Sequence, residues 1–149
     1  MSAPRRYCTF YLDGHCFGID VMQVQEVIRF QQMTPVPLVS KQIAGLINLR
    51  GQIVTAIDLR RRLELPARPA GVQPMNLVVR SGGGAVSFLV DEIGDVVEVT
   101  DESYERPPET LRGIARQLIP GTHKLSDRLL LVLDADSAVA VANGTAGAS

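Results

Sequence analysis

The chain has 149 residues, of which 46% are hydrophobic and 21% charged, and its formal net charge is -1. This length and hydrophobic content suffice for a folded domain with its own core, which excludes a disordered chain. The near-balance of charge excludes a general nucleic-acid binder, because such proteins carry a large basic excess.

The charges are divided unevenly along the chain. Residues 1–80 carry ten bases and five acids, whereas residues 81–149 carry five bases and eleven acids. Two readings stay open: a basic face and an acidic face that dock different partners, or an ordinary solvated surface.

Signals for export or membrane insertion are absent from the sequence. The first residues are not followed by the apolar run of a secretory signal. The longest uniformly apolar stretch, 129–133, is five residues long, against the roughly 20 residues that span a bilayer. We therefore expect a cytoplasmic protein without direct membrane insertion.

The first predicted element is a hairpin. Residues 7–12 and 16–20 alternate in hydrophobicity around an Asp-Gly turn, which is typical of two antiparallel strands. Period-2 geometry then places Cys8 on the inward face and Cys16 on the outward face. We predict two reduced thiols rather than a disulfide.

The next segment shows a helix pattern. Asp20 is suited to cap residues 21–28, whose apolar side chains share one stripe at helical spacing. Residues 43–49 are apolar around a glycine and are interpreted as a short helical turn or loop packed on the core. Gly51 then permits a tight turn.

The rest of the chain reads mainly as strands and turns. A strand from residue 52 leads to Asp58, which is placed to cap a short helix over 59–63. The Pro- and Gly-rich loop 66–74 is the best candidate for a break between two halves. Further predicted segments are a hairpin (76–80 and 85–90), a strand (96–99), an exposed acidic loop (101–112), a last hairpin (121–125 and 129–134), a short Ala-rich segment and a disordered tail (143–149).

Many short strands punctuated by Gly and Pro indicate an all-β protein with short helices. Their number and spacing fit one barrel, or a pair of small barrels of about 60–70 residues each that share a core.

Residues for catalysis or metal binding are sparse. His15 and His123 have no second ligand at metal spacing and are predicted to lie on the surface. The run Arg60–Arg62 is interpreted as a solvated helix face. A small enzyme that uses Cys16 or His15 would need a base and a third group to orient it, and the sequence offers none. We predict no enzymatic activity and no cofactor.

One segment is more specific. Residues 48–60 read NLRGQIVTAIDLR and resemble the NLRGxIVPVIDLR stretch of the CheW family, the coupling proteins of bacterial chemosensory arrays. Similar motifs occur in order before and after it, so that the resemblance covers residues 7–142. They are found at residues 10–12, 17–20, 24–28, 34–37, 43–45, 90–96 and 129–134.

The resemblance implies a fold and a function. The fold would be two interlocked five-stranded SH3-like barrels around a common hydrophobic core, within a domain spanning 7–142. The function would be a non-enzymatic adaptor of a two-component signalling system, which couples methyl-accepting chemoreceptors to the histidine kinase CheA. It would act in the cytoplasm, at receptor arrays under the inner membrane.

The resemblance also implies contact residues. Those for the tip of the chemoreceptor are Val24, Glu26, Gly45, Arg50 and Val96. Those for the regulatory domain of the CheA-type kinase are Ile19, Val36 and Met75.

Glu26 and Arg50 also stand out on physical grounds. Glu26 lies on the polar side of its predicted helix and Arg50 precedes a glycine turn, so we expect both heads to reach the surface and to pair. In the alternative reading, a partly buried Arg50 ties down the 43–49 loop.

The chain departs from the family pattern at three places. Thr55 and Ala56 replace a proline and a larger apolar residue, Ala44 stands where a lysine is common, and the C-terminal helix is shortened to 138–142. These departures leave open a coupling protein of a non-flagellar chemosensory pathway. A stand-alone SH3-like peptide-binding module is a further alternative, because barrel folds host many functions.

Overall fold

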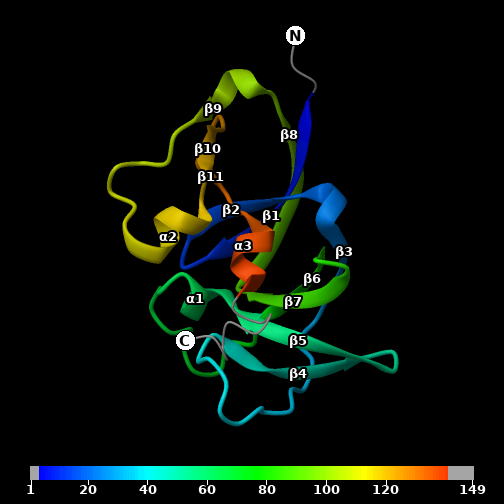
Figure 1. Cartoon of the computed structure of the whole chain (residues 1–149). Helices are drawn as coiled ribbons and strands as arrows, with labels where there is room; N and C mark the ends of the chain where they lie inside the picture. Colours follow the sequence, from blue (N-terminus) through cyan, green and yellow to red (C-terminus); the bar gives the residue numbers. More distant parts are fainter. Residues whose placement is uncertain (1–3, 141–149) are drawn as a thin grey trace.

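The structure is a computed structural model that describes residues 4–140 (Figure 1). Within that range the strands are β1 (Arg5–Leu12), β2 (His15–Asp20), β3 (Val24–Ile28), β4 (Ile43–Leu49), β5 (Gln52–Asp58), β6 (Met75–Ser81), β7 (Gly84–Val90), β8 (Glu92–Val99), β9 (Tyr104–Glu105), β10 (Gly121–Lys124) and β11 (Leu129–Val132). The helices are α1 (Leu59–Arg62), α2 (Gly113–Leu118), α3 (Ala135–Val139) and the 3-10 helices η1 (Val21–Gln23) and η2 (Asp101–Ser103). The predicted tail, 143–149, lies outside the described residues.

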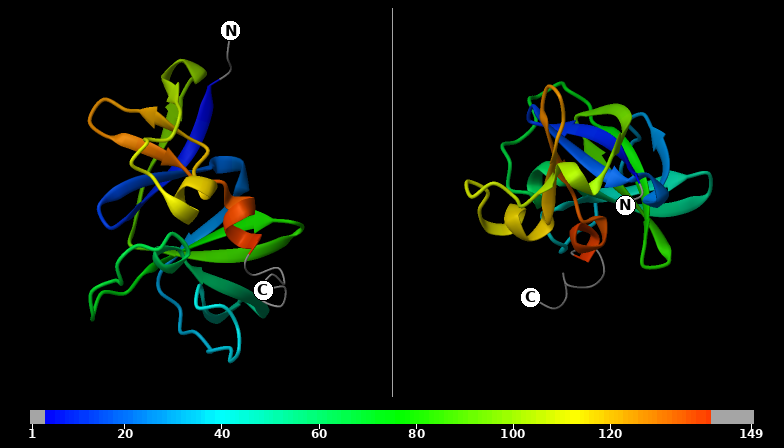
Figure 2. Two further views of the ribbon diagram at one scale, coloured as in Figure 1. Left: turned by 60° about the vertical axis from the view of Figure 1, so that its left-hand side comes forward. Right: turned by 90° about the horizontal axis from the view of Figure 1, so that it is seen from above.

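The strands form two sheets, one in each of two subdomains. The first subdomain holds a six-stranded sheet in the order β8-β1-β2-β11-β10-β9, and the second holds a five-stranded sheet in the order β3-β6-β7-β5-β4. The first lies above the second in Figure 1, with α3 between them, and Figure 2 shows the same division from two other directions. The predicted all-β class with two barrel subdomains is confirmed. The first sheet has a sixth strand because β9 pairs with β10.

The chain crosses between the subdomains twice, after β2 and again between β7 and β8. The loop 66–74 connects α1 to β6 inside the second subdomain, so the predicted break at this loop is wrong. Proline and glycine mark a turn in the backbone, but they do not reveal which sheet the following strand joins.

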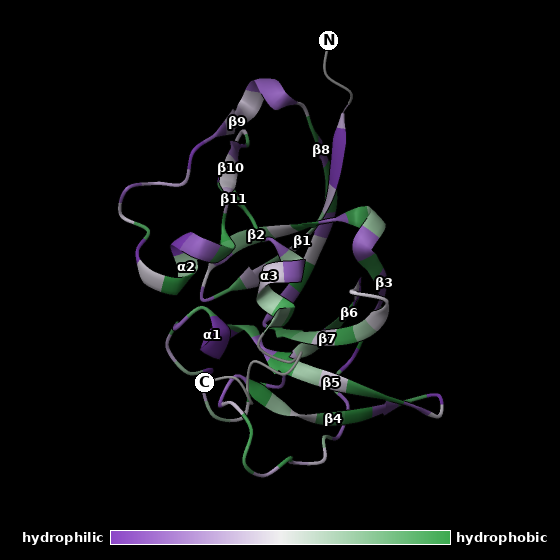
Figure 3. Cartoon of the chain, viewed as in Figure 1, coloured by the Kyte–Doolittle hydropathy of each residue, from purple (hydrophilic) through white to green (hydrophobic). Residues whose placement is uncertain are grey.

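The two subdomains share one hydrophobic core. Its largest members come from both sheets, and Phe10 stacks on Phe17 with ring centroids 5.7 Å apart. Smaller clusters fill the far side of each sheet, so strands at the centre of the molecule are buried on both faces. In Figure 3 the hydrophobic colour accordingly follows β7, whereas hydrophilic residues gather at the turn above β9. The fully buried side chains that the two sheets contribute to the shared core include Phe10, Leu12, Ile19, Ile57, Leu77 and Phe88.

Both faces of the β1–β2 hairpin are buried, and each carries one of the two cysteines. Cys8 packs in the shared core, and Cys16 packs in the separate cluster with Tyr7 and Leu130. The two thiols therefore lie on opposite faces of the hairpin and are free, as predicted. The outward face is nevertheless not open to solvent, because Cys16 is 4% exposed in a cluster with Tyr7, Val99 and Leu130.

Local signals for turns and caps are confirmed. Asp13 and Gly14 both have positive φ, as a two-residue hairpin turn requires. The side chain of Asp58 accepts a hydrogen bond from the backbone N–H of Arg60 and caps α1. Asp134 caps α3 in the same way.

The segment predicted as a helix and the segment predicted as a short helical turn or loop are both strands. After the short η1, capped by Asp20 as predicted, residues 24–28 form β3 and pair antiparallel with β6. Residues 43–49 form β4 and pair with β5. Residues 24–28 are rich in β-branched residues, whose stiff side chains favour a pleated strand once a partner strand is available.

The Arg60–Arg62 run is not a solvated face. The Arg60 side chain is 9% exposed and ion-paired with Asp91, and Arg62 donates hydrogen bonds to two backbone carbonyls of α3. Only Arg61 is largely exposed. His15 lies on the surface as predicted, whereas His123 is 1% exposed. Among the described residues no helix is long and apolar enough to cross a membrane.

Candidate functional site

Glu26 and Arg50 form an exposed ion pair between the two edges of the second sheet. Glu26 lies on β3 at one edge, and Arg50 lies in the turn that follows β4 at the other. Arg50 Nη2 donates a hydrogen bond to Glu26 Oε2. The second sheet is thus curled so that its two edge strands, β3 and β4, approach each other at this ion pair.

The pair faces solvent. The Arg50 side chain is 68% exposed and that of Glu26 is 23% exposed. The hydrogen bond from Arg50 lowers the pKa of Glu26, and Glu26 in turn raises the pKa of Arg50, so both remain charged over the working pH range. This exposure contradicts the reading of Arg50 as a buried tie for the 43–49 segment.

The turn itself presents Arg50. Arg50 and Gly51 have φ of 52° and 87°, and positive φ at both central residues defines a type I′ hairpin turn. The backbone N–H of Gly51 donates a 2.8 Å hydrogen bond to Asn48 Oδ1, which holds the turn from below. Arg50 is therefore carried on a rigid two-residue turn.

The other three predicted receptor-contact residues have different surroundings. Val24 is half-buried and packs against the shared core two residues before Glu26. Gly45 is buried on β4, where an added Cβ would lie 2.7 Å from the carbonyl oxygen of Thr34. Val96 is 47% exposed on β8 of the first subdomain, opposite Cys8.

The structure therefore brings four of these five residues onto one sheet. Val24 and Glu26 share β3, and Gly45 and Arg50 share the β4–β5 hairpin. Only the Glu26–Arg50 contact is a direct polar one. Val96 belongs to the neighbouring sheet.

The predicted kinase-contact residues differ in accessibility. Ile19 is 0% exposed in the shared core, so direct contact between its side chain and a partner is excluded. The residue points inward because β2 alternates and its inner face meets the second sheet. Met75, at the start of β6, is half-buried and packs against the same core.

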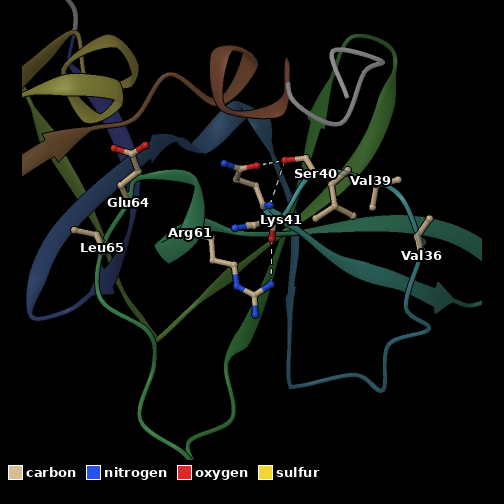
Figure 4. A pocket seen from close by; sticks show the side chains of 9 residues that line it. Val36, Val39, Ser40, Lys41, Arg61, Glu64 and Leu65 are labelled. Carbon is tan, nitrogen blue, oxygen red and sulfur yellow. Dashed lines mark hydrogen bonds between the residues drawn. The ribbon is translucent and has the colours of Figure 1, made fainter. Parts of the chain in front are cut away.

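Val36 borders a surface cavity of about 600 Å³, which is shown in Figure 4. Its rim carries Lys41, Arg61 and Glu64, and Arg61 Nη1 donates a 3.1 Å hydrogen bond to the Lys41 carbonyl. The lining mixes charged, polar and apolar side chains. It holds no nucleophile–base pair of the kind that catalysis requires.

Exposed apolar side chains were missed by the sequence analysis. Val27 is 38% exposed beside Glu26, and Ile53 is 61% exposed just after the Arg50 turn. Leu38, between the strands β3 and β4, is fully exposed. The sequence pattern of Val27 and Ile53 is that of core residues in a strand, and only the position of the neighbouring strands shows which face is open.

Within residues 4–140 no group of three or more His, Cys, Asp or Glu side chains is placed to hold a metal ion. The described surface carries an exposed charged pair on the second sheet and exposed apolar residues elsewhere on the same subdomain.

Comparison with known proteins agrees with this description. The model of the CheW-like domain matches residues 6–142. The chain is 33% identical over 137 residues to the chemotaxis protein CheW of Bacillus subtilis, covering 92% of this chain and 88% of that protein. It is 29% identical over 133 residues to the chemotaxis protein CheW of Klebsiella aerogenes, covering 89% and 80%. The crystal structure of the scaffolding protein TtCheW from Thermoanaerobacter tengcongensis superposes with a TM-score of 0.82 at 26% identity, covering 91% of this chain and 92% of that one.

Proposed function

The chain belongs to the CheW family of chemotaxis scaffold proteins, and we propose that it joins the cytoplasmic tip of a chemoreceptor to the regulatory domain of a CheA-type histidine kinase. The family is a non-enzymatic scaffold, so the prediction of a protein without enzymatic activity is confirmed. The proposed place of action is the receptor array under the inner membrane.

One observation carries the receptor half of the proposal. The Glu26–Arg50 pair is solvent-exposed, joins two sheet edges and lies on a rigid turn. Exposed ion pairs contribute little to stability, so such a pair is better explained by contact with a partner. The planar guanidinium of Arg50 has further donors free for carboxylate or backbone oxygens of a receptor helix.

The kinase half of the proposal uses a different part of the second subdomain. We assign it to the surface around Val36 and Met75, since Ile19 is buried. Two separate contact surfaces on one rigid body would raise the effective concentration of kinase at the receptor. Scaffolding of this kind needs no turnover.

A charge reversal tests the receptor contact. We expect Arg50→Glu to fold normally and to lose most receptor-stimulated kinase activity, because two like charges replace the pair and the partner meets the opposite charge. Kinase activity in reconstituted receptor membranes measures this effect, and circular dichroism checks the fold. Arg80→Glu is the matched control, since it reverses an exposed charge on β6 of the same subdomain. Normal stimulation by Arg50→Glu would remove Arg50 from the receptor surface.

The swapped pair tests whether Glu26 and Arg50 act together. The double variant Glu26→Lys with Arg50→Glu restores an ion pair of opposite polarity, so we expect partial recovery of stimulation over Arg50→Glu alone. Additive loss in the double variant would show that each residue acts separately.

Calorimetric titration into the isolated kinase regulatory domain tests the kinase half. We expect a dissociation constant near the micromolar range, about -8 kcal/mol, that is unchanged by Arg50→Glu. Absence of binding would contradict the scaffold function and leave only the barrel fold.

A further inference from the structure

Leu38 is the most exposed large apolar side chain of the described residues. It lies in the segment between β3 and β4 and is fully exposed. Single exposed leucines are common on protein surfaces, so exposure alone does not indicate a role. Leu38 is unusual because its backbone is strained as well.

The backbone of Leu38 has a φ of 62°. This left-handed conformation is unfavourable for a residue with a bulky side chain. Pro37 precedes it, and a proline followed by a residue of positive φ is the order of a type II turn, whose third residue is normally Gly or Asn. Among residues 4–140 the other non-glycine residues with positive φ are all charged: Asp13, Arg50 and Glu64.

Packing within the described part of the chain does not compensate this strain. Leu38 belongs to no hydrophobic cluster of residues 4–140, and a fully exposed side chain adds nothing to the core. Strained conformations persist where the surrounding structure enforces them, and they gather at sites that bind a ligand or partner. Strain and exposure together indicate that this leucine is held ready for contact with another molecule.

The turn that carries Leu38 is fastened on both sides. Before it, Thr34 forms two backbone hydrogen bonds of 2.8 Å with Leu46 of β4. After it, the carbonyl of Gln42 accepts a 2.8 Å hydrogen bond from the backbone N–H of Asp58. Two prolines stiffen the stretch between these points. Leu38 is therefore presented on a restricted turn, which reduces the entropy lost when a partner binds.

The surface beside Leu38 combines apolar and basic side chains. Val36 and Val39 lie on either side of it in the chain, and both line the cavity shown in Figure 4. The surface that complements such a patch has an apolar hollow with acidic side chains at its rim, because complementary charge favours docking. The charged residues of the cavity lining are two bases, both largely exposed, and one acid: Lys41, Arg61 and Glu64.

We propose that Leu38 is the anchor of the kinase contact: its side chain enters an apolar hollow on the regulatory domain of the CheA-type kinase, and Lys41 meets acidic side chains at the rim of that hollow. This assignment rests on the proposed scaffold function and deepens it, because it gives one residue the main contact. Leu38 is two residues from Val36 of the proposed kinase surface, whereas the proposed receptor surface is centred on the Glu26–Arg50 pair.

The variant Leu38→Asn separates binding from folding. Asparagine adopts positive φ more readily than leucine, so the variant should unfold at the same or a higher temperature than the original chain. Loss of the leucine should raise the Kd for the full-length kinase by about tenfold or more in calorimetric titration. An unchanged Kd would overturn the anchor, and a lower unfolding temperature would overturn it by showing that Leu38 supports the fold.

Two control variants isolate the cause of a loss. Leu38→Met keeps an apolar side chain of similar volume and should bind within about threefold of the original chain. Val72→Asn removes a 51% exposed apolar side chain from the loop 66–74 of the same subdomain and should leave the Kd unchanged. Equal losses in Leu38→Asn and Val72→Asn would contradict a specific anchor.

The charge reversal Lys41→Glu tests the acidic rim. We expect about fivefold weaker kinase binding at low salt and a smaller loss at high salt, where the charges are screened. Arg80→Glu reverses an exposed charge on β6 and should have a smaller effect. Equal effects of the two reversals would contradict an acidic rim beside Leu38.

Measurements on the original chain separate the anchor from the scaffold function. Absence of kinase binding by the original chain would overturn both, whereas binding that survives Leu38→Asn would overturn the anchor alone. Sedimentation velocity of the chain without kinase tests a second copy as the occupant. Self-association that Leu38→Asn abolishes, together with unchanged kinase binding, would assign Leu38 to a contact between copies and overturn the proposal.

Discussion

Asp91 is the centre of a largely buried ion-pair network that links the two subdomains. It lies at the crossing from β7 to β8 and receives hydrogen bonds from Arg60 at 2.5 Å, from Arg68 at 3.0 Å and from the backbone N–H of Asp13 at 2.9 Å. Burial by itself would raise the pKa of Asp91, but these hydrogen bonds together hold it below its ordinary value. A single carboxylate thus pairs with two nearly buried guanidinium groups, and Arg68 Nη2 is left without a hydrogen-bond partner among the described residues.

Removal of this carboxylate should be costly. We expect Asp91→Ala to lower the free energy of unfolding by up to about 3–5 kcal/mol, because Arg60 and Arg68 lose their closest carboxylate and keep only Asp13 at 4.0 Å and Asp58 at 3.7 Å as counter-ions. Urea denaturation measures the change. Glu92→Ala is the control, since Glu92 is exposed at the next position. A change no larger than that of the control would contradict the role of Asp91.

His123 should make stability depend on pH. Its pKa is lowered in the folded state by burial and by Arg5, so the unfolded chain takes up a proton more readily. The stabilisation is fully present above the ordinary histidine pKa of about 6.5 and is lost as pH falls toward the folded pKa. We expect the free energy of unfolding to decline between about pH 7 and 5.

A pair of histidine variants isolates this effect. His123→Gln should flatten the decline in stability with falling pH, and His15→Gln should retain it. An unchanged slope in His123→Gln would assign the decline to other groups.

At the scale of elements, pairing with a neighbouring strand decides between helix and strand where the local sequence pattern fits either. Residues 21–28 carry apolar side chains at helical spacing, yet β3 forms because β6 offers a paired edge. The pairing shifts register between Val24 and Glu26, and such a bulge re-aims side chains locally.

Gly45 shows how closely two elements approach. The backbone of Thr34 forms two 2.8 Å hydrogen bonds with Leu46, which leaves no room for a side chain at Gly45. The segment between β3 and β4 is therefore fastened to β4 at this point. The glycine inside the β4 pattern marks this close backbone approach.

Substitution of Gly45 should loosen that fastening. We expect Gly45→Val to lower the free energy of unfolding by about 1–3 kcal/mol through overpacking and to speed hydrogen exchange at the amides of Thr34 and Leu46. Gly84→Ala is the control, because nothing lies within 4 Å of its Cβ position. Unchanged exchange at both amides would contradict this account.

At the scale of the whole molecule, the shared core makes the subdomains interdependent. One cluster contains Phe10 and Phe17 from the first sheet together with Leu77 and Phe88 from the second. Separation of the subdomains would expose these side chains to water. We infer that neither half is a stable unit alone.

Two probes placed in different subdomains test this inference. The three tyrosines, Tyr7, Tyr11 and Tyr104, all lie in the first subdomain, and the chain has no tryptophan. Ile53→Trp adds an exposed probe to the second. We expect coincident urea transitions for tyrosine and tryptophan fluorescence. Earlier unfolding at one probe would show that the subdomains separate.

The uneven distribution of charge along the sequence corresponds to the division into two subdomains. Residues 21–90, which hold the second subdomain, carry eight bases and three acids, whereas the remaining residues carry seven bases and thirteen acids. The basic and acidic parts therefore follow the two subdomains. Opposite fields at the two ends favour different partners for each.

The sequence by itself determined the features that depend on near neighbours. Hairpin turns such as Asp13-Gly14 and the aspartate cap at Asp58 need only a few adjacent residues. Alternating apolar residues indicated the β class, and the 48–60 motif identified the family. The Glu26–Arg50 pair was also predicted, because both residues were expected to reach the surface.

Only the tertiary structure decided which surfaces are covered and which edges meet. The strand at 24–28, the burial of Cys16 in a cluster with Tyr7 and Leu130, and the buried environment of His123 all depend on segments distant in the chain. The same is true of Arg60, whose guanidinium is buried in an ion pair with Asp91 rather than exposed to solvent. Burial and strand pairing are long-range properties, since a partner strand supplies hydrogen bonds and a cover that no local pattern contains.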